Sequence, residues 1–244
     1  MKVMLVTGGG RGIGAAIATL AGAAGYQVAV NYVRNAEAAG KVVDAIHAAG
    51  GEGAAFRADV GDDAQVRALF AEIDAKLGRV DVLVNNAGIL GKRRIDEMDE
   101  ETLCAMFRAN VFSMYFCARE AVRRMSKKHG GRGGAIVNLS SVASRLGGLA
   151  GGTHYAATKG AIDTFTLALA KEVGPEGIRV NAIRPGLIET EMHDVHGGID
   201  PALAKAVPLG RAGHAEEVAR VAVWLASDEA SYVHGAVIDV AGGR

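Results

Sequence analysis

Short runs of apolar, often β-branched residues alternate along the chain with longer segments whose apolar residues recur at helical spacing. The short runs are continuously apolar, which is typical of strands covered by helices on both faces. We expect strands at 3–7, 27–32, 53–57, 81–85, 135–139, 179–183 and 236–240. We expect helices at 12–24, 36–48, 62–77, 99–125, 155–173 and 215–226.

This alternation predicts an α/β fold: a single-domain, doubly wound parallel sheet (a Rossmann fold) of about seven strands with helices on both faces. The length of 244 residues suits one such domain, which we expect to span residues 1–244. Residues 186–212 break the rhythm with Gly197, Gly198 and two prolines. We interpret them as a substrate-binding lid; the alternative is an ordinary surface excursion.

Charge and composition narrow the range of partners. The 27 basic and 27 acidic residues give no net charge, which disfavours a nucleic-acid binder. No apolar run reaches the roughly 18 residues of a membrane span, and no signal peptide precedes the first strand, so we expect a cytoplasmic protein without a membrane partner. Cys104 and Cys117 lie far apart along one predicted helix, and we interpret them as reduced thiols.

A glycine-rich turn, residues 7–14, joins the first predicted strand to the first predicted helix. Such a turn lets backbone amides and a helix N-terminus approach a pyrophosphate, which side chains would block. Gly10, Gly12 and Ala15 also fit the GxGxxG/A template. The context predicts a dinucleotide cofactor; a plain turn is the alternative.

The end of the second predicted strand bears on which dinucleotide is bound. NAD-specific sites usually place an acidic residue there, whereas this strand ends in Asn31-Tyr32-Val33-Arg34. Arg11 and Arg34 could neutralise a 2′-phosphate, and Asn31 could donate to it. We therefore expect NADP(H) rather than NAD(H), the alternative being that both arginines are merely exposed.

Tyr155 and Lys159 lie four residues apart at the start of a predicted helix, which places them on one face. A nearby ammonium lowers the pKa of a phenol and suits it to general acid/base catalysis. Ser140 and Ser141 follow a predicted strand at its carboxyl end, where ligands bind in such sheets. A serine there could hold a substrate oxygen.

With these motifs, the sequence resembles the short-chain dehydrogenase/reductase family over essentially the whole chain, and within it the 3-oxoacyl-(acyl-carrier-protein) reductase and glucose 1-dehydrogenase group. The residues that carry the resemblance are the Thr7-Gly8-x-x-x-Gly12-x-Gly14 turn, Asp59-Val60, Asn85-Asn86-Ala87-Gly88, Asn110, Ser141, Tyr155-x-x-x-Lys159, and Pro185-Gly186 with Thr190.

The resemblance implies roles for four catalytic residues. Tyr155 would be the acid/base, Lys159 would bind the nicotinamide ribose and lower the tyrosine pKa, and Ser141 would orient the substrate carbonyl. Asn110 would hold a proton-relaying water where the long helix is locally distorted.

The resemblance and the motifs together also give an expected set of cofactor-binding residues. Asp59 and Val60 would contact the adenine, Asn86 to Gly88 the adenosine side, and Ile188 and Thr190 the nicotinamide amide and pyrophosphate. The full set is Thr7, Gly8, Gly10, Arg11, Gly12, Ile13, Gly14, Asn31, Tyr32, Arg34, Asp59, Val60, Asn86, Ala87, Gly88, Tyr155, Lys159, Pro185, Gly186, Ile188 and Thr190.

The family also implies a homotetramer in which the helices at 99–125 and 155–173 pack across subunits. Small residues would allow close approach: Ala156, Ala157, Gly160, Ala161, Ala168 and Ala170. Packing within one subunit is the alternative. The interval between Ser141 and Tyr155 is about one residue longer than in many relatives, which weakens any analogy of substrate.

We therefore predict an NADP(H)-dependent oxidoreductase that moves a hydride between the nicotinamide and a small-molecule carbonyl or secondary alcohol. No metal is expected, and we interpret His193, Asp194 and His196 as solvated loop residues, with metal binding by these three as the alternative. The alternatives are an NAD(H)-dependent alcohol or sugar dehydrogenase, an isomerase or epimerase, and a non-catalytic NADP(H)-sensing protein.

Overall fold

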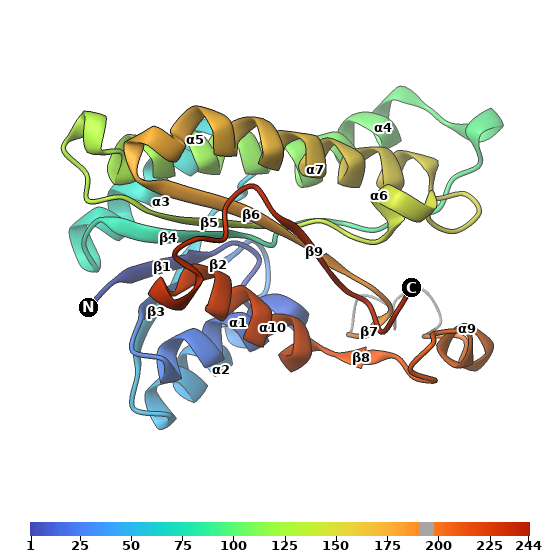
Figure 1. Ribbon diagram of the computed structural model, residues 1–244, viewed down its shortest axis with the longest axis horizontal. Coiled ribbons are helices and arrows are strands. Elements are labelled where there is room, and N and C mark those ends of the chain that lie inside the picture. The colour runs from blue at the N-terminus through green and yellow to red at the C-terminus, as the bar shows by residue number, and fades with distance from the viewer. Residues whose placement is uncertain (191–197) are drawn as a thin grey trace.

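The computed structural model describes residues 1–190 and 198–244, and its centre is one parallel sheet (Figure 1). In the described residues the strand order is β3-β2-β1-β4-β5-β6-β9, and every neighbouring pair is parallel. The strands are β1 (Val3–Val6), β2 (Gln27–Tyr32), β3 (Glu52–Arg57), β4 (Val80–Asn85), β5 (Gly134–Leu139), β6 (Ile178–Pro185) and β9 (Val237–Val240). The predicted doubly wound α/β fold is confirmed.

Helices cover both faces of this sheet (Figure 1). Helices α1 (Gly12–Ala23), α2 (Ala36–Ala48) and α10 (Ala215–Ala226) pack on one face. Helices α3 (Asp63–Lys76), α5 (Ser113–Met125) and α7 (Thr153–Val173) pack on the other. Among the described residues, the shorter α-helices are α4 (Glu100–Phe107), α6 (Ala143–Leu146) and α9 (Pro201–Lys205). The predicted helix 36–48 matches α2 at both ends, and 215–226 matches α10.

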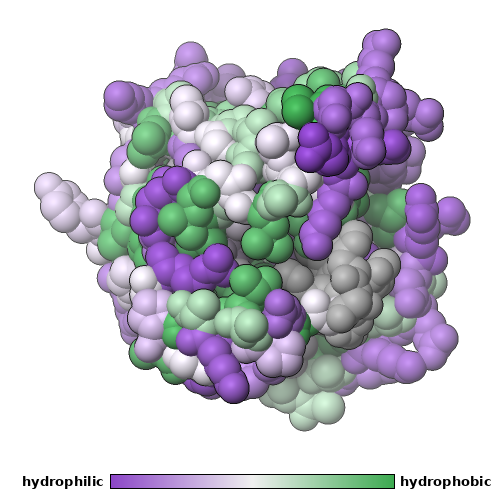
Figure 2. Space-filling view, turned by 90° about the vertical axis from the view of Figure 1, so that its right-hand side faces the viewer, coloured by the Kyte–Doolittle hydropathy of each residue, from purple (hydrophilic) through white to green (hydrophobic). Residues whose placement is uncertain are grey.

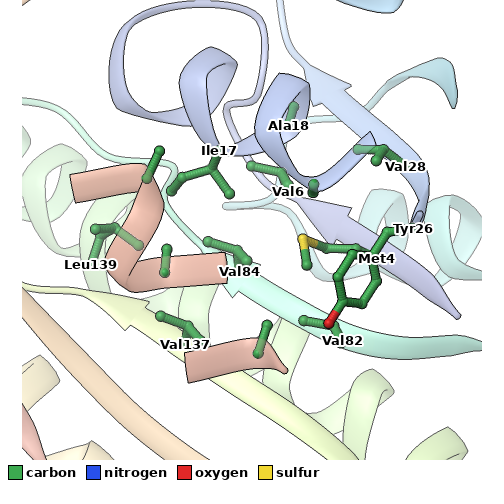
Figure 3. Packing of buried hydrophobic residues seen from close by; sticks show 14 of the residues in the cluster. Met4, Val6, Ile17, Ala18, Tyr26, Val28, Val82, Val84, Val137 and Leu139 are labelled. Carbon is green, nitrogen blue, oxygen red and sulfur yellow. The ribbon is translucent and has the colours of Figure 1, made fainter. Parts of the chain in front are cut away.

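Strand β1 shows why the strand runs are continuously apolar. Met4 and Val6 point into the cluster beneath α1 and α10, part of which Figure 3 draws. Val3 and Leu5 point into the cluster beneath α3, α5 and α7. All four are buried, because alternate side chains of a strand face opposite sides of the sheet and here both sides are covered.

The helical stretch predicted over 99–125 is present, but it is not a single regular α-helix. A π-helical segment, Arg108–Phe112, separates α4 from α5. A single π-helical turn inside a helix is often found at functional sites, because it re-aims the side chains around it. Asn110 lies in this segment, at the place where the family resemblance implies a local distortion.

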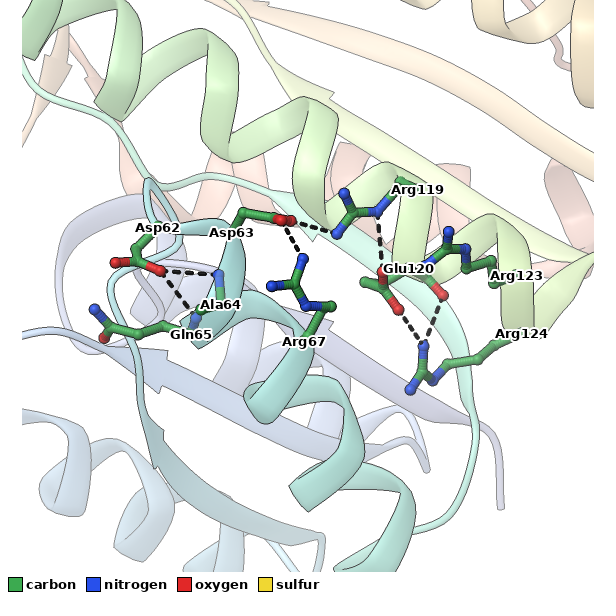
Figure 4. A network of polar contacts seen from close by, with 9 residues as sticks. All are labelled: Asp62, Asp63, Ala64, Gln65, Arg67, Arg119, Glu120, Arg123 and Arg124. Atoms are coloured by element: carbon green, nitrogen blue, oxygen red, sulfur yellow. Dashed lines mark hydrogen bonds and ion pairs between the residues drawn. The ribbon is translucent and has the colours of Figure 1, made fainter.

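Charged side chains fix α5 against α3 (Figure 4). Asp63 on α3 pairs with Arg67 on the same helix and with Arg119 on α5. Glu120, nearly buried, accepts from Arg119, Arg123 and Arg124 at 2.9–3.0 Å. Burial raises the pKa of Glu120, but Arg124 and Arg119 outweigh burial and hold it below its ordinary value. The network anchors the helix that follows the π-helical segment.

The segment 186–212 carries some regular structure of its own. Strand β7 (Ile188–Glu189) pairs in parallel with β8 (Gly213–His214), and α9 begins at Pro201. This small ladder brings the start of the segment against the residues that precede α10.

Candidate active site

A cleft opens where the strands of the sheet end. It encloses a cavity of about 100 Å³. It is lined by Ile13, Asn86, Gly88, Ile89, Leu139, Ser140, Ser141, Tyr155, Lys159, Pro185, Gly186, Ile188 and Thr190. The end of the molecule that holds the strand ends faces the viewer in Figure 2, where apolar side chains lie between hydrophilic ones. The structure thus brings three of the four expected catalytic residues to one cleft, together with much of the expected cofactor set.

The glycine turn is built for close approach of a backbone. Gly8 and Gly12 have positive φ angles of 60° and 52°, which other residues rarely adopt. A Cβ at Gly14 would lie 2.4 Å from the Gly8 carbonyl oxygen and 2.5 Å from Asn86 Nδ2. Helix α1 starts at Gly12 without a side-chain cap from Arg11. The first amides of α1 are therefore available to an anionic group, and the turn fits a dinucleotide pyrophosphate.

Thr7 and Asn86 hold this turn in shape. The Thr7 hydroxyl donates to the Val84 carbonyl and accepts from the amides of Asn86 and Ala87. Asn86 Nδ2 donates to the carbonyls of Thr7 and Gly8, at 3.0 and 3.1 Å. Both side chains are thus committed to joining the ends of β1 and β4.

Asn31 does not serve the role that we predicted for it. Its side chain is fully buried, Oδ1 accepts from the Gly8 amide, and Nδ2 donates to the carbonyls of Ala58 and Phe56 at 3.0 and 3.3 Å. The amide is committed to the backbone, so it is not available to a 2′-phosphate. Asn31 instead braces the glycine turn against β3.

Basic side chains remain at the end of β2. Arg34, two residues after β2, is exposed, and Tyr32 is partly exposed. Arg11, also exposed, precedes α1. Arg57, which our sequence analysis missed, is the register partner of Tyr32, and its Nε donates to the Val33 carbonyl at 3.3 Å. The signal for Arg57 was its place at the end of the neighbouring strand.

The residues after β3 form a short turn. Asp59 Oδ1 accepts from the Gly61 amide at 2.9 Å, while the Asp59 amide donates to Gln65. Asp59 is exposed and Val60 is buried, so the two expected adenine contacts differ in accessibility. Neither residue lines the cleft around Tyr155.

Tyr155 and Lys159 lie together in the cleft, on the first turns of α7. Lys159 Nζ lies 5.5 Å from the centre of the Tyr155 ring. It donates to the Leu139 carbonyl at 2.8 Å. Lys159 is buried, and burial lowers its pKa to about 8 against the opposing effect of Asp163. An ammonium held inside the protein in this way is poised to change its charge near neutral pH.

The pKa of Tyr155 shifts in the direction opposite to the one we expected. Burial raises the pKa of the phenol, and the Ser141 hydroxyl opposes this effect only in part. In this structure Lys159 faces the ring instead of bonding to the hydroxyl. The phenol of Tyr155 is therefore protonated at neutral pH and able to donate.

The two serines after β5 have different surroundings. Ser140 is buried, and its Oγ donates to the Lys159 carbonyl at 3.1 Å, which ties the strand end to α7. Ser141 Oγ accepts from the Ala143 amide at 3.1 Å. The proton of the Ser141 hydroxyl is directed away from that amide, so Ser141 is the serine suited to donate to a ligand in the cleft.

Asn110 lies behind the cleft and does not line it. Its Oδ1 accepts from the Ile89 amide at 2.7 Å, and its Nδ2 donates to the Ile89 carbonyl at 3.0 Å and to Thr158 Oγ1 at 3.1 Å. The side chain joins the loop after β4 to α7, next to Lys159. In this structure it positions the walls of the cleft.

A buried ladder of polar side chains was also missed by sequence analysis. Asn85 Nδ2 donates to Asn138 Oδ1, and Asn138 Nδ2 donates to Thr166 Oγ1, both at 2.9 Å. The ladder joins β4, β5 and α7. A signal was present, since each asparagine comes at the end of an otherwise apolar strand run.

His154 lines a second, wider cavity of about 500 Å³ that shares Ile89 with the cleft. The ring is 4 % exposed, and its Nδ1 is buried without a hydrogen-bond partner among the described residues. Burial lowers the pKa of His154, and Arg93 lowers it further. The imidazole is therefore neutral at pH 7.

Three further features concern the metal-ligating side chains, the two cysteines and the length of the apolar helices. Among residues 1–190 and 198–244, no three His, Cys, Asp or Glu side chains gather closely enough to hold a metal ion. His193, Asp194 and His196 lie outside the described residues. Cys104 is exposed and Cys117 buried, and neither forms a disulfide. In the same described ranges, no helix has both the length and the apolar character of a membrane span.

Comparisons with known proteins agree with this geometry. The family model described as "Enoyl-(Acyl carrier protein) reductase" matches residues 8–244. Over all of both chains, the sequence is 50 % identical to "Uncharacterized oxidoreductase YgfF" of Escherichia coli (strain K12). It is 41 % identical to the Pseudomonas aeruginosa 3-oxoacyl-(acyl-carrier-protein) reductase FabG, with 99 % of this chain and 96 % of the relative covered. It is 40 % identical to versicolorin reductase 1 of Aspergillus parasiticus, with 99 % and 95 % covered.

Solved structures give the same result. A mutant of a Serratia marcescens short-chain dehydrogenase/reductase superposes with a TM-score of 0.92 at 34 % identity, covering 99 % of this chain and 97 % of that one. The family's members use a nicotinamide cofactor and act on small molecules. The chain belongs to the short-chain dehydrogenase/reductase family and is an oxidoreductase that acts on carbonyl or CH–OH groups.

Proposed function

We propose that this enzyme is an NADP(H)-dependent carbonyl reductase or secondary-alcohol dehydrogenase with Tyr155 as its general acid/base. The observation that carries the proposal is the single cleft lined by Ser141, Tyr155 and Lys159, beside the residues that follow the glycine turn. When bound, the nicotinamide cofactor supplies or accepts the hydride. The chain then has to hold the substrate oxygen and exchange one proton with it.

Ser141 and Tyr155 would bind the substrate oxygen from two sides. The raised pKa of Tyr155 keeps its phenol protonated, so the hydroxyl can give its proton to the oxygen as a carbonyl is reduced. A hydrogen bond from Ser141 strengthens as negative charge develops on that oxygen. Lys159, 5.5 Å from the ring centre, favours the phenolate that remains. The same groups run in reverse for alcohol oxidation.

The cofactor would lie along the ends of the strands. The first amides of α1, between Gly12 and Gly14, would hold the pyrophosphate. Gly186, Ile188 and Thr190 line the cleft and would hold the nicotinamide end, which supports residues 186–212 as the proposed substrate-binding segment. Arg11, Arg34 and Arg57 carry positive charge where a 2′-phosphate would lie, and this charge supports NADP(H) over NAD(H).

The remaining residues of the expected set would support the cofactor from behind. Thr7, Gly8, Asn31 and Asn86 shape the turn through the contacts described above. Asn110 connects the loop after β4 with α7, so we propose that it sets the distance between the nicotinamide and Tyr155.

A spectrophotometric assay tests the proposal. Purified enzyme is mixed with NADPH or NADH and with versicolorin, a 3-oxoacyl thioester or small ketones, the first two being compounds in the names of relatives. We expect steady loss of NADPH absorbance with at least one carbonyl. Saturable NADPH binding without turnover of any compound would favour a sensing protein, and faster reaction with NADH would overturn the cofactor assignment.

We also propose that the enzyme is a cytoplasmic homotetramer. The π-helical segment, α5 and α7 leave large apolar side chains exposed, including Phe112 (46 %), Tyr115 (51 %) and Leu167 (46 %). Such a patch suits contact with a second copy. Light scattering after size exclusion tests this proposal: Tyr115→Glu should yield smaller species, whereas Lys41→Glu on α2 should not.

The proposed cytoplasmic location is supported by Cys104, whose exposed thiol suits a reducing compartment.

A further inference from the structure

A buried carboxylate lies one helical turn beyond Lys159. Asp163 is 8 % exposed and follows Lys159 by four residues on α7, so the two side chains share a face of the helix. Asp163 Oδ2 accepts from Arg184 Nε and Nη2, both at 2.9 Å. Its Oδ1 is buried without a hydrogen-bond partner among the described residues.

Arg184 connects this carboxylate to a chain of alternating charges. Its Nη1 lies 3.4 Å from Asp239 Oδ1 on β9. Asp239 Oδ2 lies 3.2 Å from Arg145 Nη2 on α6, and Arg145 also donates to the Arg244 carbonyl at 2.6 Å. These ion pairs therefore link α7, β6, β9 and α6.

An ion pair that is largely removed from water contributes less to stability than its geometry suggests. Taking Asp163 and Arg184 out of water costs free energy that their mutual attraction only partly offsets, and apolar residues of similar size often stabilise a fold as well. The pair is also incompletely satisfied, because Arg184 occupies only one of the two carboxylate oxygens. A negative charge that is not fully neutralised is thereby kept inside the protein, one helical turn along α7 from the buried Lys159.

The charged groups around Lys159 are few. Tyr155 and Asp163 lie on its own helix, on either side of it. From β5, the contact is the uncharged carbonyl of Leu139. From β6, Arg184 approaches through Asp163, and Asp239 and Arg145 lie further out. Asp163 is thus the acidic group placed to counter the burial of Lys159.

We propose that Asp163 is a positioning residue that keeps Lys159 protonated, and that Arg184 sets the strength of this effect by neutralising part of the carboxylate. The inference rests on the proposed function of Lys159 beside Tyr155. Burial lowers the pKa of Lys159 to about 8, while Asp163 raises it. Without Asp163, the lysine would lose its proton at lower pH, and the phenolate of Tyr155 would lose its compensating charge.

Four enzymes separate this role from a structural one: wild type, Asp163→Asn, Arg184→Gln and the double variant D163N/R184Q. The readout is the pH at which kcat falls on the alkaline side. We expect this pH to be highest in Arg184→Gln, where the carboxylate is no longer neutralised, and lowest in Asp163→Asn, where Arg184 repels the lysine. The wild type should lie above the double variant, and Asp163→Asn should lie about one pH unit or more below the wild type.

Any other ranking of the four enzymes by the pH at which kcat falls would overturn the proposal. A uniform loss of kcat with an unchanged pH profile in Asp163→Asn would give the pair a structural role only. The pair would also have only a structural role if Arg184→Gln and Asp163→Asn both shift the pH profile of kcat in the same direction from the wild type. The double variant guards against a folding failure, because it leaves no unpaired buried charge. Asp239→Asn is the control, because Asp239 lies beyond Arg184 in the series of ion pairs. It should move the pH profile of kcat much less.

A second readout does not depend on turnover. The ionisation of Lys159 can be followed by NMR of labelled lysine side chains in the cofactor-free protein, with the signal assigned from Lys159→Arg. A downward shift of the Lys159 pKa in Asp163→Asn supports the proposal even if no carbonyl substrate is found. An unchanged pKa contradicts it whatever the activity.

Discussion

Lys159 lies against the ring of Tyr155, with its Nζ 5.5 Å from the ring centre and its hydrogen bond directed to the Leu139 carbonyl. The ammonium therefore acts on the phenol through space and not by a direct bond to the hydroxyl. Burial is the larger influence on Tyr155 and raises its pKa. The resting form of the pair is a neutral phenol beside a lysine that is ready to stabilise the phenolate.

Replacement of Tyr155 by phenylalanine removes the hydroxyl that we propose passes the proton to the substrate oxygen. We expect turnover to fall by about 10²- to 10⁴-fold, the usual contribution of a general acid. The affinity for NADPH should change little, because the ring and its contact with Lys159 remain. Steady-state rates and fluorescence titration of NADPH measure the two effects. Tyr232→Phe, at a fully exposed position, is the matched control. Full activity in Tyr155→Phe would remove the proposed mechanism.

The double variant R11A/R34A tests the proposed phosphate contacts. NADPH should bind about tenfold more weakly or worse, the effect of losing one charge-assisted hydrogen bond. NADH, which has no 2′-phosphate, should bind as before. Adding Arg57→Ala should widen the difference, since Arg57 lies at the same corner. Arg94→Ala, at an exposed position on the loop after β4, serves as control. An unchanged ratio of the two dissociation constants contradicts the assignment.

Substitution of two glycines by alanine should change the free energy of unfolding in opposite directions. A Cβ at Gly14 would lie 2.4 Å from the Gly8 carbonyl oxygen, so Gly14→Ala should destabilise the fold by about 1–3 kcal/mol and weaken cofactor binding. Gly40 lies inside α2 with nothing within 4 Å of such a Cβ. Gly40→Ala should therefore stabilise by about 0.5–1 kcal/mol. Urea unfolding measures both, and equal effects would mean that the turn is looser than described.

Stability should decrease on mild acidification because of His154. Its folded-state pKa lies below the ordinary value, through burial first and Arg93 second. As the pH falls through about 6.5, the unfolded chain binds a proton that the folded protein does not, which favours unfolding. The loss continues until the pH passes the lower, folded-state pKa. Urea unfolding from about pH 7.5 to about pH 5, a range that brackets the ordinary histidine pKa of about 6.5, measures the free energy of unfolding. His154→Leu should flatten this dependence, whereas the exposed His129→Leu should leave it intact.

Local patterns in the sequence were enough to predict much of this protein. The apolar strand runs and the helical repeats gave the doubly wound sheet, because strand and helix periodicities depend only on neighbours along the chain. The ends were off by one or two residues, as at β6, which continues to Pro185. The glycine turn and the Tyr155–Lys159 spacing were visible for the same reason, and both lead to one cleft.

Contacts between distant segments decided the rest. The break in the helix at 108–112 goes with the bonds of Asn110 to Ile89 and Thr158, which are 21 and 48 residues away in the chain. Asn31 looked available to a phosphate, but Gly8 and Ala58 occupy its side chain.

The order of strands and helices, and the residue types that reach the strand ends, followed from patterns among neighbouring residues. The tertiary structure decided which polar atoms remain available there and what charge they carry. Tyr155 shows the difference, because its spacing to Lys159 predicted a lowered pKa and its burial raises it. Burial and hydrogen-bond partners are properties of packed neighbours, and these come from parts of the chain that no local pattern connects.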